Sequence, residues 1–214
     1  MELVRLTMLY LVRHGQSMAN ITDTFAGSSD FELTKLGVRQ AELLSSYFEN
    51  IFVNSIYSSD LSRAVNTIMP TAEKKGIKII KDRKLREIFG GEWENKSFDY
   101  INENYSEDFL IWKTDPRNAC CPGGESVADV EKRVFDEITK IAEKNIGKNV
   151  VVATHAMAVR TFVSAVSGID IKDVPWVSNA SVSSFYYDDG VFSLKQSGYD
   201  DYLCDIKTTF NHNI

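Results

Sequence analysis

The strongest signal in the chain lies at Met8–Asn20, MLYLVRHGQSMAN. Its first five residues are largely apolar, which is typical of a strand buried in an α/β sheet. The strand ends on Arg13 and His14, and ligands of open α/β sheets bind outside the carboxyl ends of the strands. Gly15 then allows a tight exit and close approach of a ligand. A guanidinium that fits phosphate oxygens, next to an imidazole that can act as a nucleophile, predicts a phosphoryl site.

A second segment shows the same pattern of an apolar run that ends in a histidine. Lys148–His155, KNVVVATH, is apolar over most of its length and also ends in a histidine. The helix expected from Met157 to about Val166 would direct its N-terminus, which favours anions, at the same pocket. We therefore expect the imidazoles of His14 and His155 to meet around one tetrahedral anion.

Length and composition limit the class of protein. The 214 residues suffice for one sizeable α/β domain, and because no repeat or linker divides them we expect a single domain over residues 1–214. The net charge of −6 argues against nucleic acid or a membrane surface as the main partner. No apolar run is long enough to span a membrane. The three cysteines form no C-x-x-C pair, and cleavage of a signal peptide would remove the first strand, so we expect a cytoplasmic protein.

The remaining segments alternate between strand and helix signals. Thr34 and Ser126 are suitable N-caps for helices with an apolar face. Further strands are predicted at Ser55–Ser59, Gly76–Asp82, Ser181–Tyr187 and Val191–Ser197, the last two as a hairpin.

Two stretches carry weaker signals. Residues 96–122 are rich in aromatic side chains and have a slightly acidic balance of charge, which predicts one or two short helices that cap the pocket. Residues 200–214 are polar and are predicted to form a surface tail in which His212 has no chemical role.

Five motifs, in this order, resemble those of the histidine phosphatase superfamily, also called phosphoglycerate mutase-like. They are the Arg-His-Gly of residues 13–15, the SSDLSRA segment at 58–64, the LREIFGGEWE segment at 85–94, the PGGES turn at 122–126 and the strand that ends in His155. The resemblance covers most of the chain. It implies a three-layer α/β/α fold with a central, mostly parallel sheet.

The resemblance also implies a role for each matching residue. His14 is the expected nucleophile and Glu87 the expected general acid, while Arg13, Arg63 and His155 would hold the phosphoryl oxygens. The neighbouring carboxylates Glu92 and Glu94 are expected to face solvent instead.

Three further positions match the substrate-binding parts of the motifs. Asn20 and the Phe-Ala-Gly turn that ends at Gly27 correspond to the loop that touches the phosphate, with Ala26 where a polar residue is common. Ala156 stands where glycine is usual, and its small side chain leaves the backbone N–H available. Asn95 replaces another common glycine, which bears on loop geometry more than on catalysis.

These residues supply a nucleophile, positive charge and a proton donor, as phosphoryl transfer requires. We therefore expect a metal-independent phosphomonoesterase that forms a phosphohistidine on a small phosphorylated metabolite, with no cofactor. One alternative is a cofactor-dependent phosphoglycerate mutase. In that branch the acid is followed by Arg-His-Tyr-Gly, whereas Glu87 is followed by Ile-Phe-Gly-Gly. A second alternative is an inactive phosphate-binding or scaffold protein, which predicts loss of the nucleophile or the acid. No histidine–carboxylate spacing suggests a metal site, and no P-loop is present.

Overall fold

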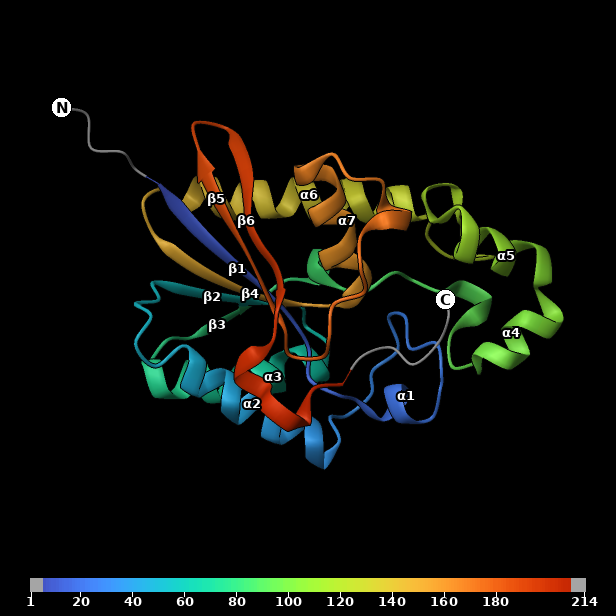
Figure 1. The fold of residues 1–214 in the computed structure, drawn as a ribbon, viewed down its shortest axis with the longest axis horizontal. Helices are drawn as coiled ribbons and strands as arrows, with labels where there is room; N and C mark the ends of the chain where they lie inside the picture. Colours follow the sequence, from blue (N-terminus) through green and yellow to red (C-terminus); the bar gives the residue numbers. More distant parts are fainter. Residues whose placement is uncertain (1–5, 209–214) are drawn as a thin grey trace.

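The structure, a computed structural model, describes residues 6–208 and contains a six-stranded sheet in the order β3-β2-β4-β1-β5-β6 (Figure 1). The pairings among the first four strands of this order are parallel, and β5 and β6 add two antiparallel pairings. The mostly parallel sheet is therefore confirmed. The strands are β1 (Thr7–Arg13), β2 (Ser55–Ser58), β3 (Ile79–Lys81), β4 (Asn149–Thr154), β5 (Val182–Asp188) and β6 (Val191–Tyr199).

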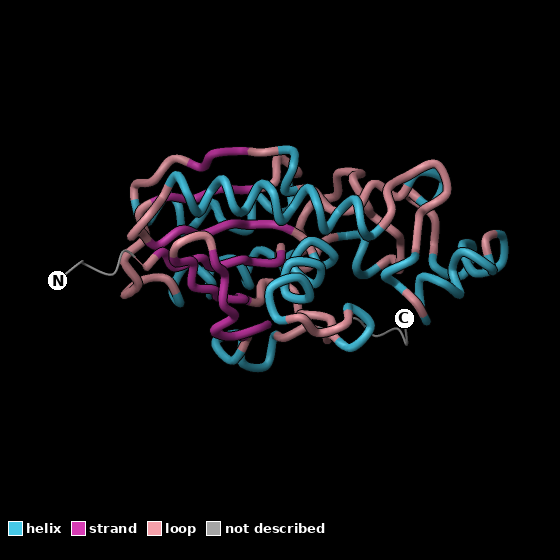
Figure 2. Tube along the Cα trace, turned by 90° about the horizontal axis from the view of Figure 1, so that it is seen from above, coloured by secondary structure: helices cyan, strands magenta, loops and turns pink. Residues whose placement is uncertain are grey.

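Helices cover both faces of this sheet. Figure 1 shows α2 and α3 on one face and α6 and α7 on the other, and Figure 2 shows the helices and the strands from above. The α-helices are α1 (Met18–Ile21), α2 (Lys35–Tyr47), α3 (Ser62–Lys75), α4 (Phe98–Asn104), α5 (Ser106–Thr114), α6 (Val127–Lys144) and α7 (Ala156–Ser167). Short 3₁₀ helices lie at Arg83–Leu85, Gly91–Trp93, Pro116–Asn118, Ile171–Asp173 and Asp201–Ile206.

The alternation of side chains along β1 explains why both faces need cover. Leu9 and Leu11 belong to the apolar cluster shared with α6 and α7, whereas Tyr10 and Val12 belong to the cluster shared with α2 and α3. Successive residues of a strand point to opposite faces, so a strand that is apolar throughout needs a helix layer on each side. The continuous apolar run thus leads to the three-layer α/β/α arrangement.

Both predicted N-caps begin a helix. The Thr34 hydroxyl accepts a hydrogen bond from the N–H of Gly37, 3.0 Å away, at the start of α2. The Ser126 hydroxyl accepts one from the N–H of Asp129 at the start of α6, and the Asp129 carboxylate accepts from the Ser126 N–H in return. This reciprocal pair is a capping box.

The segment at 96–122 forms α4 and α5, in line with the predicted one or two short helices. They project at one end of the molecule, at the right of Figure 1. Their aromatic side chains pack edge to face around Trp93, with ring centroids 5.9 Å from Phe109 and 5.7 Å from Trp112. Because Phe25 also contacts Trp93 at 5.5 Å, the cap is fixed to the loop that follows α1.

The prediction of a polar tail from residue 200 is wrong for the residues that the structure describes. Leu203 is fully buried. The buried Gln40 of α2 donates hydrogen bonds to the Ile206 carbonyl at 2.9 Å and to the Thr208 hydroxyl at 3.0 Å. One apolar side chain and a polar partner on α2 therefore hold this segment against the body. His212 lies outside the described residues.

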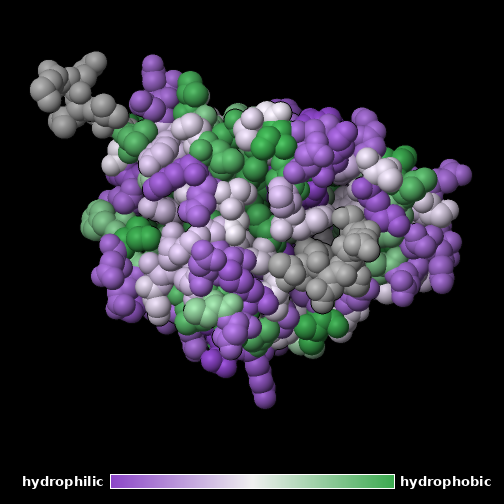
Figure 3. All heavy atoms as spheres, viewed as in Figure 1, coloured by the Kyte–Doolittle hydropathy of each residue, from purple (hydrophilic) through white to green (hydrophobic). Residues whose placement is uncertain are grey.

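The face in Figure 3 carries scattered hydrophobic side chains among hydrophilic ones, without a continuous hydrophobic band. Within residues 6–208, no helix combines the length and the apolar character that crossing a membrane requires.

Candidate active site

A cavity of about 570 Å³ opens at the carboxyl ends of β1 and β4. His155 stands apart from its wall, fully buried, with its ring centroid 5.2 Å from that of His14. The structure thus brings all the sequence-predicted site residues to one place. The seven that line the cavity are Arg13, His14, Asn20, Gly27, Arg63, Glu87 and Ala156.

The orientation of His14 is fixed by the residue after it. The ring Nδ1 lies 2.7 Å from the Gly15 carbonyl, which can only accept, so Nδ1 carries the proton. In the neutral ring Nε2 then keeps its lone pair. Burial first, and then the nearby guanidiniums of Arg63 and Arg13, hold the pKa of His14 well below its ordinary value. The imidazole is therefore neutral at pH 7, which is the form in which a histidine can act as a nucleophile.

His155 is the N-cap residue of α7. Its Nε2 lies 2.8 Å from the Ser59 hydroxyl at the end of β2. Burial and the charge of Arg63 lower the pKa of His155 well below its ordinary value. Ser59 was not singled out in the sequence, although it belongs to the same motif as Arg63.

Two buried guanidiniums flank His14. Arg13 ends β1 and donates from Nη1 to the Val177 carbonyl at 2.5 Å. Arg63, in the first turn of α3, donates from its two Nη atoms to the carbonyls of Ser29 and Gly27, each at 2.7 Å. Burial lowers the pKa of each arginine to about 10, so both remain charged at pH 7. Arg63 is thus held by carbonyl dipoles rather than by a carboxylate, which leaves its charge available to an anion.

The loop that holds Arg63 needs glycine at position 27. Gly27 has φ +48°, and a Cβ there would lie 2.3 Å from Oε1 of Glu94. That carboxylate accepts hydrogen bonds from the N–H groups of Ser28 at 2.6 Å and Gly90 at 3.0 Å, and from the Ser29 hydroxyl. The expectation that Glu94 faces solvent is therefore wrong, because the carboxylate ties this loop to the segment that follows Glu87.

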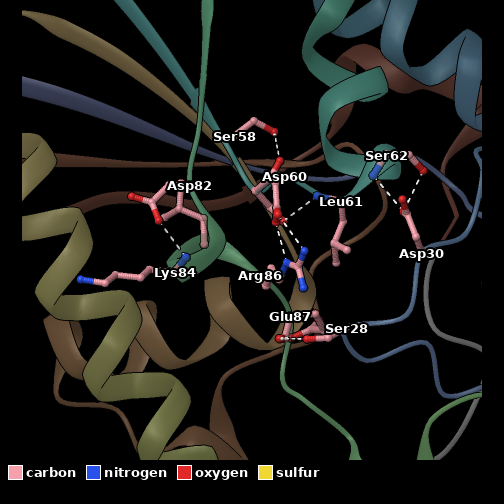
Figure 4. A network of polar contacts seen from close by, with 12 residues as sticks. Ser28, Asp30, Ser58, Asp60, Leu61, Ser62, Asp82, Lys84, Arg86 and Glu87 are labelled. Atoms are coloured by element: carbon pink, nitrogen blue, oxygen red, sulfur yellow. Dashed lines mark hydrogen bonds and ion pairs between the residues drawn. The ribbon is translucent and has the colours of Figure 1, made fainter.

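Other carboxylates fix the motifs around the cavity (Figure 4). Asp30 accepts from the N–H and the hydroxyl of Ser62, both at 2.8 Å, and so caps α3, which has no side-chain cap of its own. Asp60 accepts two hydrogen bonds from Arg86, at 2.5 and 2.7 Å. The turn that carries Arg63 and the segment that carries Glu87 are thereby joined.

Glu87 lies half-buried across the cavity, with both carboxylate oxygens held. Oε1 accepts from the N–H of Ile88 at 2.9 Å, and Oε2 accepts from the N–H of Met157 at 3.1 Å. Since Met157 is in the first turn of α7, the N-terminus of this helix points at Glu87 as well as at the cavity. Glu92, in contrast, is exposed, as expected.

Sequence reasoning missed Arg133. From α6 it donates to the carbonyls of Lys84, Arg86 and Glu87 at 2.7 to 2.9 Å, and it pairs with Glu125 at 2.6 Å. The side chain therefore holds the backbone at Glu87 and in the residues just before it. It stands among the polar positions of an amphipathic helix, where no local pattern separates it from a solvent-exposed arginine.

Asn20 and the missed Asn179 form a second support. Oδ1 of Asn20 accepts from the N–H of Ser17 at 2.9 Å and from Nδ2 of Asn179 at 3.2 Å. Asn179 also donates to the His14 carbonyl at 3.1 Å. Because Oδ1 of Asn20 already accepts hydrogen bonds within the protein, its Nδ2 is the atom that can donate to a ligand.

The outer wall of the cavity is built from segments without a recognised motif. Phe98 and Trp112 come from the cap, Trp176 from the loop before β5, and Lys207 and Thr208 from the C-terminal segment. Within residues 6–208, no group of three or more His, Cys, Asp or Glu side chains is arranged to hold a metal ion.

Comparisons of the sequence and of the structure with known proteins agree with one another. Phosphoserine phosphatase 1 of Hydrogenobacter thermophilus is 33% identical over 164 residues, which cover 77% of this chain and 78% of that protein. A Yersinia pestis protein named probable phosphoglycerate mutase GpmB is 30% identical over 192 residues, which cover 81% of this chain and 89% of that protein. The solved structure of Bacillus stearothermophilus YhfR has a TM-score of 0.88 and 28% identity, and the match covers 92% of this chain and 99% of that one.

The model of the histidine phosphatase superfamily (branch 1) matches residues 9–200, which include every site residue predicted from the sequence. The chain therefore belongs to the histidine phosphatase superfamily.

Proposed function

We propose that the protein is a metal-independent phosphomonoesterase that acts on a small phosphorylated metabolite through a phosphohistidine at His14. The observation that carries this proposal is the neutral His14, with its Nε2 lone pair, beside the charged Arg13 and Arg63 and across the cavity from Glu87. These groups supply the nucleophile, the positive charge and the proton carrier of a phosphoryl transfer.

The reaction divides into two transfers. In the first, His14 Nε2 forms a bond to phosphorus as the ester oxygen leaves, and protonated Glu87 gives its proton to that oxygen. Arg13 and Arg63 neutralise the phosphoryl oxygens, and the amide of Asn20 is a further donor. His155 was expected to hold these oxygens too, but it does not line the cavity, and its ring lies 5.2 Å from that of His14 instead. In the second transfer, water attacks the phosphohistidine and gives its proton to Glu87, which releases phosphate and restores His14.

The structure of the cap favours hydrolysis over the mutase alternative. A mutase that binds a second phosphate needs further cations at the cavity, yet the cap residues that line it are Phe98 and Trp112. The cations of the cap are occupied outside the cavity: Lys96 lies over the Tyr100 ring, Lys113 over the Phe109 ring, and Arg117 pairs with Glu131. The inactive alternative is disfavoured because nucleophile and acid face the same cavity.

Trapping of labelled phosphate tests the proposal. With p-nitrophenyl phosphate, whose leaving group needs no proton, Glu87→Gln should slow mainly the second transfer and accumulate acid-labile label on the protein. His14→Ala should carry no label and lose phosphate release by about a thousand-fold or more, as expected for loss of a nucleophile. Activity should survive a metal chelator.

The alternatives predict other outcomes. Isomerisation of phosphoglycerate with negligible phosphate release would establish a mutase. Absence of label in the Glu87→Gln variant, together with no turnover of any monoester, would favour the inactive phosphate-binding protein.

A further inference from the structure

We infer that the site is built for phosphate monoesters of uncharged, apolar alcohols, and that a flat ring is the favoured leaving group. The inference rests on the phosphatase activity proposed above and concerns the part of the substrate that leaves with the ester oxygen. It is carried by the wall of the cavity beyond the groups assigned to phosphate.

Just over half of the residues in that wall are apolar, and several of these are aromatic. It brings together side chains from the loop after α1, the Glu87 segment, the cap, α7 and the loop before β5. The principal ones are Phe25, Ile88, Phe98, Trp112, Met157 and Trp176. Aromatic rings offer large, rigid surfaces that favour offset or edge contacts with another ring.

These aromatic side chains are already held in place. The Phe25 ring lies 5.6 Å from Trp112 and 5.9 Å from Phe98, between ring centroids. Trp176 is covered by the Arg160 guanidinium at 4.0 Å, and Arg160 is itself buried and donates to the carbonyl of Val174 at 3.1 Å. A preorganised wall binds an apolar group without the cost of ordering these side chains.

The lysine in the same wall is already paired, which disfavours the carboxylate of an amino-acid leaving group. Among the described residues, Asp23 and Lys207 are the charged ones that line the cavity apart from those assigned to the phosphate chemistry. Lys207 Nζ lies 2.8 Å from Asp200 and 2.9 Å from Asp201, and these carboxylates raise its pKa. A substrate carboxylate would have to compete with two aspartates for this ammonium group.

The size of the cavity agrees with such a leaving group. A volume of about 570 Å³ is within the range of about 300–1,000 Å³ that small-molecule sites occupy. This volume suits a phosphate that carries a ring on a short linker. The smallest monoesters would need a smaller cavity with less apolar surface.

The test compares monoesters of aliphatic alcohols, all of which need a proton on the leaving oxygen, so that leaving-group chemistry does not determine the order. We expect kcat/KM for 3-phenylpropyl phosphate to exceed that for ethyl phosphate and for phosphoserine by about ten-fold or more, which is typical of an added apolar group in a fitted pocket. Trp176→Ala should lower the ratio of phenylpropyl to ethyl phosphate by about ten-fold. Trp176→Phe should restore most of that ratio.

Phe52→Ala is the matched control, because Phe52 is 73% exposed and lies outside the cavity wall, and it should keep the wild-type ratio. Circular dichroism of each variant checks that it folds. Equal or better turnover of phosphoserine would overturn the inference and leave the phosphatase proposal intact.

A binding measurement keeps the inference testable without turnover. Calorimetry with 3-phenylpropylphosphonate and ethylphosphonate, which cannot be hydrolysed, should give tighter binding of the phenylpropyl compound. Equal affinities would overturn the inference. If the protein binds the phenylpropyl compound more tightly but forms no phosphohistidine, the proposed catalysis is refuted and the inference about the leaving group stands.

Discussion

At the scale of single residues, Glu94 illustrates how a carboxylate outside the chemistry organises a phosphate site. It holds the N–H groups of Ser28 and Gly90, and the carbonyls of the same loop accept the hydrogen bonds of Arg63. The sequence predicted Glu94 in solvent because its partners Ser28 and Ser29 lie 66 and 65 residues earlier in the chain, where no local pattern indicates the contact. Arg13 and His14, by contrast, come directly after an apolar run, so the sequence alone places them at the end of a strand.

Glu94→Gln should weaken phosphate binding as well as stability. The amide would turn a donor toward N–H groups that need an acceptor, which costs about 1–3 kcal/mol of the free energy of unfolding. Because the loop that orients Arg63 is then loosened, the inhibition constant for inorganic phosphate should rise by about ten-fold, in line with loss of one well-placed contact. Denaturant unfolding and inhibition of hydrolysis measure the two effects.

Glu92→Gln is the control, since this exposed carboxylate accepts a hydrogen bond from the Tyr105 hydroxyl and no other from residues 6–208. It should change neither quantity appreciably. Loss of stability in Glu94→Gln with unchanged phosphate inhibition would confine Glu94 to a structural role.

At the scale of elements, strands and helices with strong local signals were predicted well. β1, β4 and the β5–β6 hairpin follow their sequence patterns, and α2 and α6 start at the expected caps. The C-terminal segment was missed because Leu203 is buried through its fit to α2, and a lone apolar residue carries no periodicity. The short α1 was missed because turn-forming residues dominate its surroundings.

The contact between α6 and the Glu87 segment yields a prediction for Arg133. Lysine cannot reproduce a planar fork that binds several carbonyls and a carboxylate at once. Arg133→Lys should therefore lower kcat by about ten-fold, equivalent to about 1.4 kcal/mol in the barrier, with a smaller change in KM.

The neighbouring Lys132→Ala serves as the control, because the Lys132 side chain is 77% exposed and pairs with Asp136 in the same helix. Its kinetics should match the wild type. An Arg133→Lys variant with lower stability but an unchanged kcat would contradict a positioning role.

At the scale of the whole molecule, the fold concentrates basic side chains in an acidic protein. The net charge is −6, yet Arg13, Arg63, His14 and His155 are all buried around one cavity. Motifs at strand and helix ends made this cluster predictable. The outer wall was not predictable, because Trp176 and Lys207 reach the cavity from a loop and a terminal segment whose paths depend on the assembled fold.

This concentration of charge makes stability depend on pH. Burial and the guanidiniums lower the pKa of His14 and of His155 below the ordinary 6.5, so the unfolded chain binds more protons than the folded one as pH falls. The contribution of each neutral histidine to stability is present above pH 6.5 and is lost below it. From about pH 6.5 down to about pH 5.5, the free energy of unfolding should fall by roughly 1 kcal/mol per histidine. Urea unfolding across this range measures the slope. His14→Gln and His155→Gln should each remove about half of it, and a slope that neither change reduces would show that the two imidazoles are not held neutral by the fold.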